Sequence, residues 1–514
     1  MFIKVLLILI FFGIMIGVGI VCRKQAKDVR GFVLGGRNVG PWLSAFAFGT
    51  SYFSAVIFVG YAGQFGWKFG LASTWIGLGN AFIGSLLAWT ILGRRTRIMT
   101  QHLSSATMPQ FFESRFDSKA LKLISSIIIF IFLIPYTASL YNGLSRLFGM
   151  GFNVDYTICI IVMAILTAVY VIAGGYMATA INDFIQGMIM LVGIVAIILS
   201  VLKINGGFAG SLDALARISD ASVSGTPGIF ASFFGPDPFS LLCVVILTSL
   251  GTWGLPQMVQ KFYAIKSEND IHKGTVISTI FAIVVAGGCY FLGGFGRLFD
   301  VNVASEGFDA IIPAMLAHLS PVVFGIALVL VLSASMSTLS SLVLASSSTL
   351  TLDFIDPVFF GNKRDEKKNL PIIRIFIAVF ILISAVIAIV QYKKNVTFIA
   401  QLMGLSWGAL AGSFLAPFLY SLYWKKTTKA SCIVCFIWGS VLMLANMFFK
   451  SSFPTVLQSP INCGAFAMLG GMVIGPIVSA FTRKPDKQQI DNIFSCYEKK
   501  VMAPITDVLS SEEA

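Results

Sequence analysis

The sequence predicts an all-α polytopic membrane protein. Hydrophobic residues make up 57% of its 514 residues and charged residues only 11%, and the mean hydropathy is +0.87. Apolar runs of about 18 residues or more, each long enough to cross a bilayer as a helix, recur along the whole chain. This composition excludes a soluble globular protein, and we expect a multi-pass protein in the lipid bilayer of the plasma (inner) membrane.

The predicted transmembrane helices number about thirteen. They cover residues 2–22, 41–64, 70–93, 121–147, 154–173, 178–202, 238–262, 274–297, 320–350, 371–392, 398–424, 430–449 and 463–482. The first run is too long for the apolar core of a signal peptide and no small-residue cleavage site follows it, so we interpret it as a retained helix.

The net charge of +13 would suggest nucleic-acid binding in a soluble chain. In a membrane protein it predicts basic cytoplasmic loops instead, and no nucleic-acid partner. Basic residues gather in 23–37, 94–120, 261–273, 361–368 and 425–429, and all of these loops fall on one side of thirteen alternating spans. The pattern predicts an N-terminus outside the cell and a C-terminus in the cytoplasm.

The spans divide the chain into a repeated arrangement. We expect an N-terminal helix with a basic loop (1–40), a first block (41–202), an extracellular loop (203–237), a second block (238–424), two peripheral helices (425–482) and a cytoplasmic tail (483–514). Each block has five spans, and because five is odd the blocks have opposite orientations in the membrane. That is the topology of an inverted repeat, which is typical of secondary transporters.

The first helix of each block contains residues that disfavour a continuous helix. Residues 48–55 (FGTSYFSA) are mostly small or hydroxyl-bearing, and residues 251–256 (GTWGLP) end in a proline that removes a backbone donor. Gly and Pro are also frequent in membrane helices in general. Because the two segments lie at corresponding places, we favour functional breaks that expose backbone groups to ions and solute.

The helix 320–350 has a stretch rich in hydroxyl groups, 331–348. Ala334, Ser337, Thr338 and Ser341 recur at helical spacing and therefore share one face. Such residues often serve helix packing in membranes. They can also offer neutral oxygens to a small, hard cation.

Ionisable side chains inside spans are costly, so each one is a candidate functional residue. Asp183 lies about one turn inside the span 178–202. It is either a charge at the cytoplasmic end of the helix or a group that attracts a second ion along an exit path. Cys432 and Cys435 form a CxxC motif without further ligands, which favours packing over metal binding.

Seven motifs in order resemble the sodium:solute symporter family, the group of the sodium/proline, sodium/pantothenate and sodium/glucose transporters. They are 34–37 (LGGR), 173–176 (AGGY), 182–186 (NDFIQ), 254–256 (GLP), 293–297 (GGFGR), 334–340 (ASMSTLS) and 421–425 (SLYWK). The resemblance covers roughly residues 30–430, and the motifs are most similar to those of the pantothenate and proline symporters.

The resemblance implies a LeuT-type inverted-repeat core of five plus five helices, with one extra helix before it and two after it. It also implies a sodium site between the first and eighth core helices. Carried over by position, its ligands are the carbonyl groups of Thr50, Phe53 and Ala334 and the hydroxyl groups of Ser337 and Thr338. Na⁺ is then the coupling ion, and no cofactor, other metal or obligatory protein partner is expected.

Candidate residues for the solute cavity come from the two breaks and from the third core helix. They are Ser51, Tyr52, Ser54, Tyr141, Asn142, Thr252, Trp253 and Gln257. Half-helix N-termini and hydroxyl groups can bind a carboxylate without a full countercharge. Members that resemble the proline transporter have Asp where this chain has Tyr52, which argues against proline and favours the pantothenate type.

The sequence therefore predicts a Na⁺-coupled symporter, not an enzyme, that imports a small carboxylate-bearing solute by alternating access. The solute classes left open are a pantothenate-like compound, a monocarboxylate and an amino acid such as proline. The alternatives are a Na⁺-independent amino-acid exchanger of the same fold, a sugar symporter, a channel and a membrane sensor. The short tail does not supply a signalling domain, and the paired breaks argue against a channel.

Overall fold

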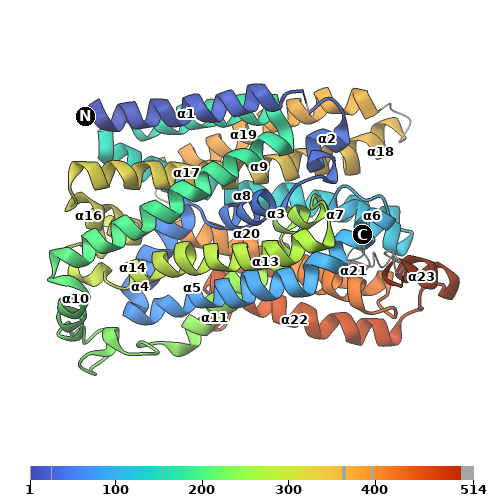
Figure 1. Cartoon of the computed structure of the whole chain (residues 1–514). Helices are drawn as coiled ribbons and strands as arrows, with labels where there is room; N and C mark the ends of the chain where they lie inside the picture. Colours follow the sequence, from blue (N-terminus) through green and yellow to red (C-terminus); the bar gives the residue numbers. More distant parts are fainter. Residues whose placement is uncertain (1, 25, 153, 362–365, 395–398, 499–514) are drawn as a thin grey trace, which may run out of the picture.

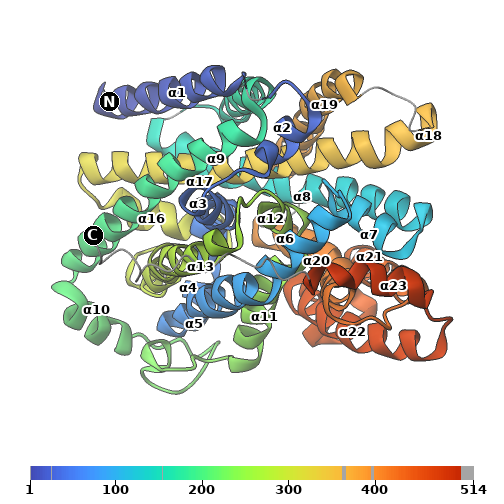
Figure 2. The same ribbon diagram turned by 45° about the vertical axis from the view of Figure 1, so that its right-hand side comes forward.

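The computed structural model describes residues 2–24, 26–152, 154–361, 366–394 and 399–498. Long helices lie side by side in a single bundle, and two views of it are given in Figures 1 and 2. Among the described residues there is no strand, and only two isolated bridges, Val39 with Ile265 and Asp220 with Ser224, join extended segments. The predicted all-α class is confirmed.

All thirteen predicted spans fall on helical segments. The first span is α1 (Phe2–Cys22). The first block contains α3 (Pro41–Tyr52), η2 (Val56–Tyr61), α4 (Ala62–Phe69), η3 (Gly70–Ser73), α5 (Thr74–Gly79), η4 (Asn80–Leu87), η5 (Trp89–Gly93), α8 (Lys119–Phe152) and α9 (Tyr156–Ile204). The second contains α11 (Pro238–Gly254), α12 (Pro256–Tyr263), α13 (Glu268–Ala282), η7 (Ile283–Gly287), α14 (Gly288–Gly293), α17 (Pro321–Thr349), η10 (Leu350–Ile355), α19 (Glu366–Lys394) and α20 (Ile399–Tyr423). The last two are α21 (Lys429–Phe448) and α22 (Pro460–Phe481).

Shorter helices fill the connections. They are α2 (Val29–Leu34), η1 (Gly35–Arg37), α6 (Arg94–His102), α7 (Met108–Phe116), α10 (Gly207–Ala216), η6 (Ile229–Ala231), η8 (Gly296–Leu298), α15 (Val303–Glu306), η9 (Phe308–Ala310), α16 (Ile311–Ala317), α18 (Asp356–Phe360), η11 (Lys450–Ser452), η12 (Thr455–Leu457), α23 (Lys487–Phe494) and η13 (Ser495–Tyr497).

In the described part of the chain, nine helices are long and apolar enough to cross a membrane, or ten if the bent pair α11 and α12 is one span. Two of them, Val56–His102 and Tyr156–Ile204, have 47 and 49 residues. A straight helix of that length would measure about 70 Å, more than twice the ~30 Å of a bilayer core. Each of these runs therefore accounts for more than one predicted span, and the count of thirteen crossings stays a prediction.

A glycine in a left-handed conformation turns the chain inside each of these long runs. Gly70 has φ 62° and Gly175 has φ 57°. A Cβ at Gly70 would lie 2.0 Å from the carbonyl oxygen of Phe230, and a Cβ at Gly175 would lie 2.7 Å from the ring of Phe32. Both positions therefore require glycine for the backbone conformation as well as for space.

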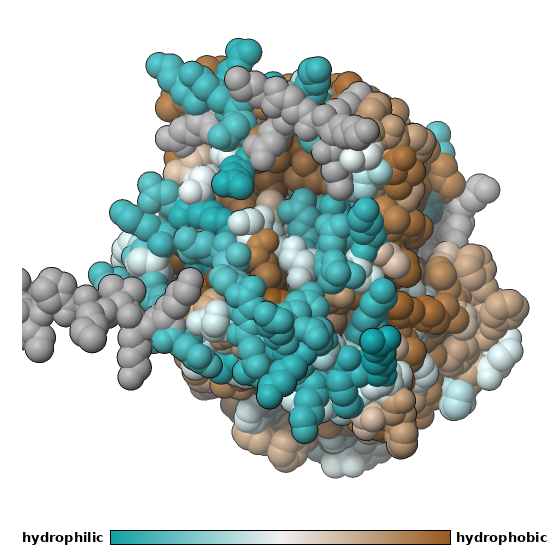
Figure 3. Space-filling view, turned by 90° about the vertical axis from the view of Figure 1, so that its right-hand side faces the viewer, coloured by the Kyte–Doolittle hydropathy of each residue, from teal (hydrophilic) through white to brown (hydrophobic). Residues whose placement is uncertain are grey.

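The surface has the polarity of a multi-pass membrane protein. Large apolar side chains are exposed on the outer helices, for example Leu9, Ile165, Leu199, Leu382 and Val473. Figure 3 views the end of the bundle where α6, α7 and α23 lie, and hydrophilic residues gather there while hydrophobic residues border them. Burial of such outer helices in lipid accounts for this distribution.

Several connecting segments contain helices that the sequence did not predict. The basic loop 94–120 includes α6 and α7, the loop 203–237 includes α10, and the polar tail includes α23. In the tail, Asp491 pairs with Lys425 at 2.9 Å, and the Tyr497 hydroxyl donates to the Arg95 carbonyl oxygen at 3.2 Å. The first part of the tail is thus docked on the bundle. Residues 499–514 of the tail and 362–365 of the predicted loop 361–368 lie outside the described residues.

Candidate functional site

Both predicted helix breaks are confirmed. Helix α3 ends at Tyr52, Phe53 is extended (φ −84°, ψ 119°), and the helix resumes in η2. Helix α11 ends at Gly254, Leu255 has nearly the same conformation (φ −80°, ψ 121°), and Pro256 begins α12 at a bend of 45°. Carbonyl groups in the last turn before each break lack regular helical partners, so they remain available as acceptors.

The five predicted ion ligands meet where broken α3 crosses α17; we call this set (Thr50, Phe53, Ala334, Ser337 and Thr338) the five-oxygen junction. The Ser337 hydroxyl lies 2.9 Å from the Thr50 carbonyl oxygen and 3.2 Å from that of Ala334. The Thr338 hydroxyl lies 3.2, 3.4 and 3.1 Å from the carbonyl oxygens of Thr50, Phe53 and Ala334. All five residues are buried.

The five-oxygen junction holds more acceptors than protons. Two hydroxyl protons serve three carbonyl oxygens, and each hydroxyl oxygen has lone pairs of its own. The carbonyl and hydroxyl groups of the five-oxygen junction carry no formal charge, and all five oxygens are hard ligand atoms. The arrangement therefore suits a small hard cation, which interacts favourably with several inward-facing oxygens.

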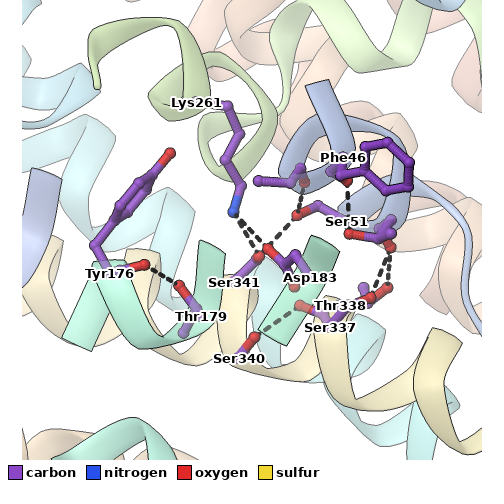
Figure 4. A network of polar contacts seen from close by, with 12 residues as sticks. Phe46, Ser51, Tyr176, Thr179, Asp183, Lys261, Ser337, Thr338, Ser340 and Ser341 are labelled. Atoms are coloured by element: carbon purple, nitrogen blue, oxygen red, sulfur yellow. Dashed lines mark hydrogen bonds and ion pairs between the residues drawn. The ribbon is translucent and has the colours of Figure 1, made fainter. Parts of the chain in front are cut away.

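The face of α17 continues to Ser341, one turn beyond Thr338, where a buried ion pair lies (Figure 4). Lys261 Nζ lies 2.9 Å from Ser341 Oγ and 3.5 Å from Asp183 Oδ2. The Ser341 hydroxyl also lies 2.8 Å from the Ser51 hydroxyl, which donates to the Ala47 carbonyl oxygen at 2.5 Å. Polar contacts therefore connect Asp183 on α9 with broken α3.

The predicted span 238–262 and the predicted basic loop 261–273 overlap at Lys261. Helix α12 continues through Tyr263 and only 3% of Lys261 is exposed, so this residue belongs to the buried helix and not to a loop. Asp183 is fully buried, about two helical turns after the kink at Gly175 that divides α9 into two helices. It is therefore not an exposed charge at the end of a helix, and Lys261 compensates its charge inside the protein.

A small cavity lies between the two breaks. Its volume is about 10 Å³, room for about one water molecule. Tyr52, Phe53 and Thr252 line it, together with three polar residues that the sequence analysis missed, Asn80, Ser85 and Ser278. The polarity of these three residues within apolar spans was the available signal.

Beside the cavity, Trp407 of α20 lies between the two breaks. Its ring centroid is 5.7 Å from that of Tyr52 and 5.9 Å from that of Tyr136. A Cβ at Gly251, just before the second break, would lie 3.0 Å from the Trp407 ring. Sequence reasoning missed Tyr136 and Trp407, because aromatic residues on apolar helices carry no local sign of their neighbours.

We call Tyr52, Ser54, Tyr136 and Trp407 the donor cluster. Ser54 lies beside Tyr136. The three hydroxyl groups and the indole N–H are buried. Ser54 and Trp407 approach the Tyr136 hydroxyl, and Tyr52 approaches that of Tyr290, but none of these contacts has the geometry of a regular hydrogen bond. A better-placed acceptor would stabilise such donors, because an unsatisfied buried polar group costs about 1–3 kcal/mol.

Of the remaining predicted cavity residues, only Thr252 lines the small cavity. The Asn142 side chain accepts from the Tyr156 hydroxyl, and the Trp253 indole donates to the Ile83 carbonyl oxygen at 3.0 Å. Thr252 donates to the Gly84 carbonyl oxygen at 3.0 Å, which joins the second break to η4. Tyr141 and Gln257 are buried, and the Tyr141 hydroxyl and the Gln257 side-chain oxygen make no regular hydrogen bond to a described residue.

The described residues contain no group of three or more His, Cys, Asp and Glu side chains that could hold a metal ion. Cys432 and Cys435 are both buried free thiols, and the Cys435 thiol lies 3.7 Å from the Gly471 carbonyl oxygen on α22. This contact is consistent with a packing role for the CxxC motif.

Comparison with known proteins gives concordant matches over nearly the whole chain. The model of the sodium:solute symporter family matches residues 32–439. The osmoregulated proline transporter OpuE of Bacillus subtilis (strain 168) is 28% identical over 502 residues, which cover 95% of this chain and 97% of that protein. A sodium/proline symporter of Staphylococcus aureus (strain JH9) is 29% identical over 498 residues, 93% of each chain.

Among solved structures, that of a Na⁺-coupled sialic acid symporter in a substrate-bound outward-open state matches with a TM-score of 0.75. The match covers 95% of this chain and 99% of that one, at 16% sequence identity. At this identity the likeness concerns the fold.

Proposed function

The chain belongs to the sodium:solute symporter family, and from this premise we propose that it imports a small carboxylate-bearing solute together with Na⁺ bound at the five-oxygen junction. The observation that carries the proposal is the meeting of five buried neutral oxygens at the break in α3. It supports an alkali cation as the coupling ion, since a proton-coupled site would call for a titratable carboxylate among the ligands.

The proposed topology has thirteen membrane-spanning helices with an inverted-repeat, LeuT-type core. The two breaks, at Phe53 and Leu255, have nearly equal backbone angles and occur in the first helix of each predicted block. This correspondence supports the inverted repeat. In the proposed orientation the N-terminus is outside, and the hydrophilic end of the bundle, where α6, α7 and α23 lie, is in the cytoplasm.

The proposed mechanism is alternating access. Extracellular Na⁺ binds at the junction and fixes the carbonyl groups of Thr50 and Phe53, which holds broken α3 against α17. Tyr52 lies between these two residues, so Na⁺ binding also orients one member of the donor cluster. Solute binding then permits closure and release of both inside. One Na⁺ moving down a 100 mV potential contributes about 2.3 kcal/mol, before any Na⁺ gradient.

The donor cluster supports a carboxylate as the anchoring group of the solute. Hydroxyl and indole N–H groups are donors that a carboxylate can accept from without a cationic side chain nearby. The rings of Tyr52, Tyr136 and Trp407 would cover an apolar body. The names of the relatives favour proline as the first solute to test, although Tyr52 replaces the Asp of proline-transporter-like members. A pantothenate-like compound and a monocarboxylate remain the other candidates.

The test is uptake into proteoliposomes. Radiolabelled proline, pantothenate, lactate and glucose are supplied in turn, with an inward gradient of either Na⁺ or choline. We expect one of the first three to accumulate with Na⁺ and not with choline. Equal uptake in both would contradict Na⁺ coupling and favour an exchanger. Na⁺-dependent uptake of glucose alone would favour a sugar symporter.

A further inference from the structure

The second charged centre of the bundle is the pair of Lys261 and Asp183. The two side chains are 4% and 0% exposed, and they come from α12 and α9. Ser341 of α17, whose hydroxyl accepts from Lys261, follows Thr338 by three residues and Ser337 by four. The pair therefore lies about one helical turn along α17 from the five-oxygen junction (Figure 4).

The oxygen atoms around the ammonium group are of kinds that also serve as ligands of an alkali cation. They are the Asp183 carboxylate, 3.5 Å away, and the Ser341 hydroxyl, 2.9 Å away. Asp183 Oδ1 makes no hydrogen bond to a described residue. A carboxylate at this depth requires a positive charge beside it, and here the chain supplies that charge itself.

The hydrogen bonds fix the donor order around Ser341. The Ser51 hydroxyl donates to the Ala47 carbonyl oxygen, so Ser341 donates to Ser51 and accepts from Lys261. Each hydroxyl group thus donates its single proton once. The hydrogen bonds therefore run from the ammonium group to α3 with one donor and one acceptor in each. Ser51 is the neighbour of Thr50, so this chain reaches the same turn of α3 as the five-oxygen junction.

We propose that the ammonium group of Lys261 is a built-in cation that takes the place of a second Na⁺ at Asp183 and Ser341. The chain consequently binds one Na⁺ per transport cycle. A second Na⁺ near Asp183 would have to displace an ammonium group that is tethered at high effective concentration, or bind beside a like charge in a poorly solvated site. The inference rests on the proposed function, because it assigns the ion stoichiometry of the same site.

The test counts Na⁺ ions bound to the purified full-length protein, by equilibrium binding of radioactive Na⁺ without any solute. We expect one Na⁺ per chain for the wild type and for Lys261→Arg, which keeps the charge. We expect two for Lys261→Ala, which frees Asp183, and one again for Lys261→Ala combined with Asp183→Asn. Elution as a single symmetric peak in gel filtration checks that each variant is folded.

Equal numbers of bound Na⁺ in the wild type and Lys261→Ala would overturn the inference. Two Na⁺ bound to the wild type would also overturn the inference, and one Na⁺ bound to the wild type would support it. This count on the wild type is decisive even if Lys261→Ala does not fold. Absence of Na⁺ binding to the wild type would overturn the proposed function, while a gain of one ion in Lys261→Ala would still support the role of Lys261. The two failures are therefore distinguishable.

Discussion

The Ser337 hydroxyl donates to the carbonyl oxygen of Thr50 at 2.9 Å, although the two residues are 287 positions apart. The bond joins the middle of α17 to the last turn of α3, next to the point where Phe53 leaves helical geometry. A cation bound there would contact both helices at once. Its binding is therefore coupled to any movement of α3 against α17.

Removing a junction hydroxyl should weaken Na⁺ binding. For Ser337→Ala and Thr338→Ala we expect the Na⁺ concentration for half-maximal uptake to rise about tenfold or more, since a lost contact to a charged partner costs roughly 1.5–3 kcal/mol. Thr338→Ser keeps the hydroxyl and should stay near the wild type. The matched control is Ser335→Ala, whose hydroxyl donates to Val331 within α17. Unchanged Na⁺ dependence in both junction variants would reduce these hydroxyls to a packing role.

The donor cluster should affect the solute more than the ion. Tyr52→Phe and Trp407→Phe each remove one donor, and we expect the solute KM to rise several-fold to tenfold in each. The Na⁺ concentration for half-maximal uptake, measured at saturating solute, should change less than twofold. Tyr420→Phe is the control, because that hydroxyl donates to Met472 between α20 and α22, away from the breaks. A rise in KM in the control alone would refute the assignment.

The turn at Gly175 should tolerate no side chain. Gly175→Ala forces alanine into a backbone conformation (φ 57°, ψ −151°) that is essentially restricted to glycine, which costs about 1–3 kcal/mol, and places a Cβ 2.7 Å from the Phe32 ring. We expect a lower melting temperature in detergent, by several degrees. Gly36 lies in the milder left-handed helical region (φ 68°, ψ 13°) with no atom within 4 Å of its Cβ position, so Gly36→Ala should cost less. Gly17→Ala, with open space and no positive φ, should cost nothing. A different order of the three melting temperatures would contradict this account.

The loop after α10 is held by Asp220. Its carboxylate pairs with Arg297 at 3.0 Å, and the Arg297 guanidinium lies over the Phe230 ring at 3.8 Å. We expect Asp220→Asn to speed tryptic cleavage after the exposed Arg217 about two- to fivefold, since a partly exposed pair is worth at most ~1 kcal/mol. Asp213→Asn, an exposed carboxylate on α10, is the control and should have no effect.

This difference should not depend on pH between 6 and 9. Hydrogen bonds from Ser222 and Arg297 hold the pKa of Asp220 below its ordinary value, so the carboxylate stays charged through that range. A depressed pKa means that the contribution of the pair is lost only as the pH falls through the lowered value. A difference between wild type and variant that vanishes near pH 6 would show that another group holds the loop.

The breaks in α3 and α11 were predictable because their cause is local. Gly, Pro and hydroxyl residues weaken a helix wherever they gather, and the two clusters occupy corresponding places in the blocks. The junction residues of α17 followed from helical spacing and family resemblance together. Without the family resemblance, nothing in the sequence would have indicated that these residues of α17 lie next to Thr50 and Phe53.

The partners of Asp183 and Tyr52 were not predictable, since they depend on how whole helices are placed. Lys261 lies near the end of an apolar run, where a basic residue is as consistent with a loop as with a buried pair. Only the bend at Leu255 directs α12 so that Lys261 reaches Ser341. Likewise, Trp407 meets Tyr52 because α20 passes between the two breaks, which no pattern within α20 reveals.

Three of the five oxygens at the junction belong to the main chain. Any residue at positions 50, 53 and 334 that preserves the backbone keeps its carbonyl oxygen in place, so substitutions there act through packing. Only Ser337 and Thr338 contribute atoms that a single codon change can delete. Natural substitutions at positions 50, 53 and 334 can therefore alter the ion site but leave its ligand atoms present. Only substitutions at the two adjacent codons for Ser337 and Thr338 can remove a ligand, so the genetic vulnerability of the site is concentrated there.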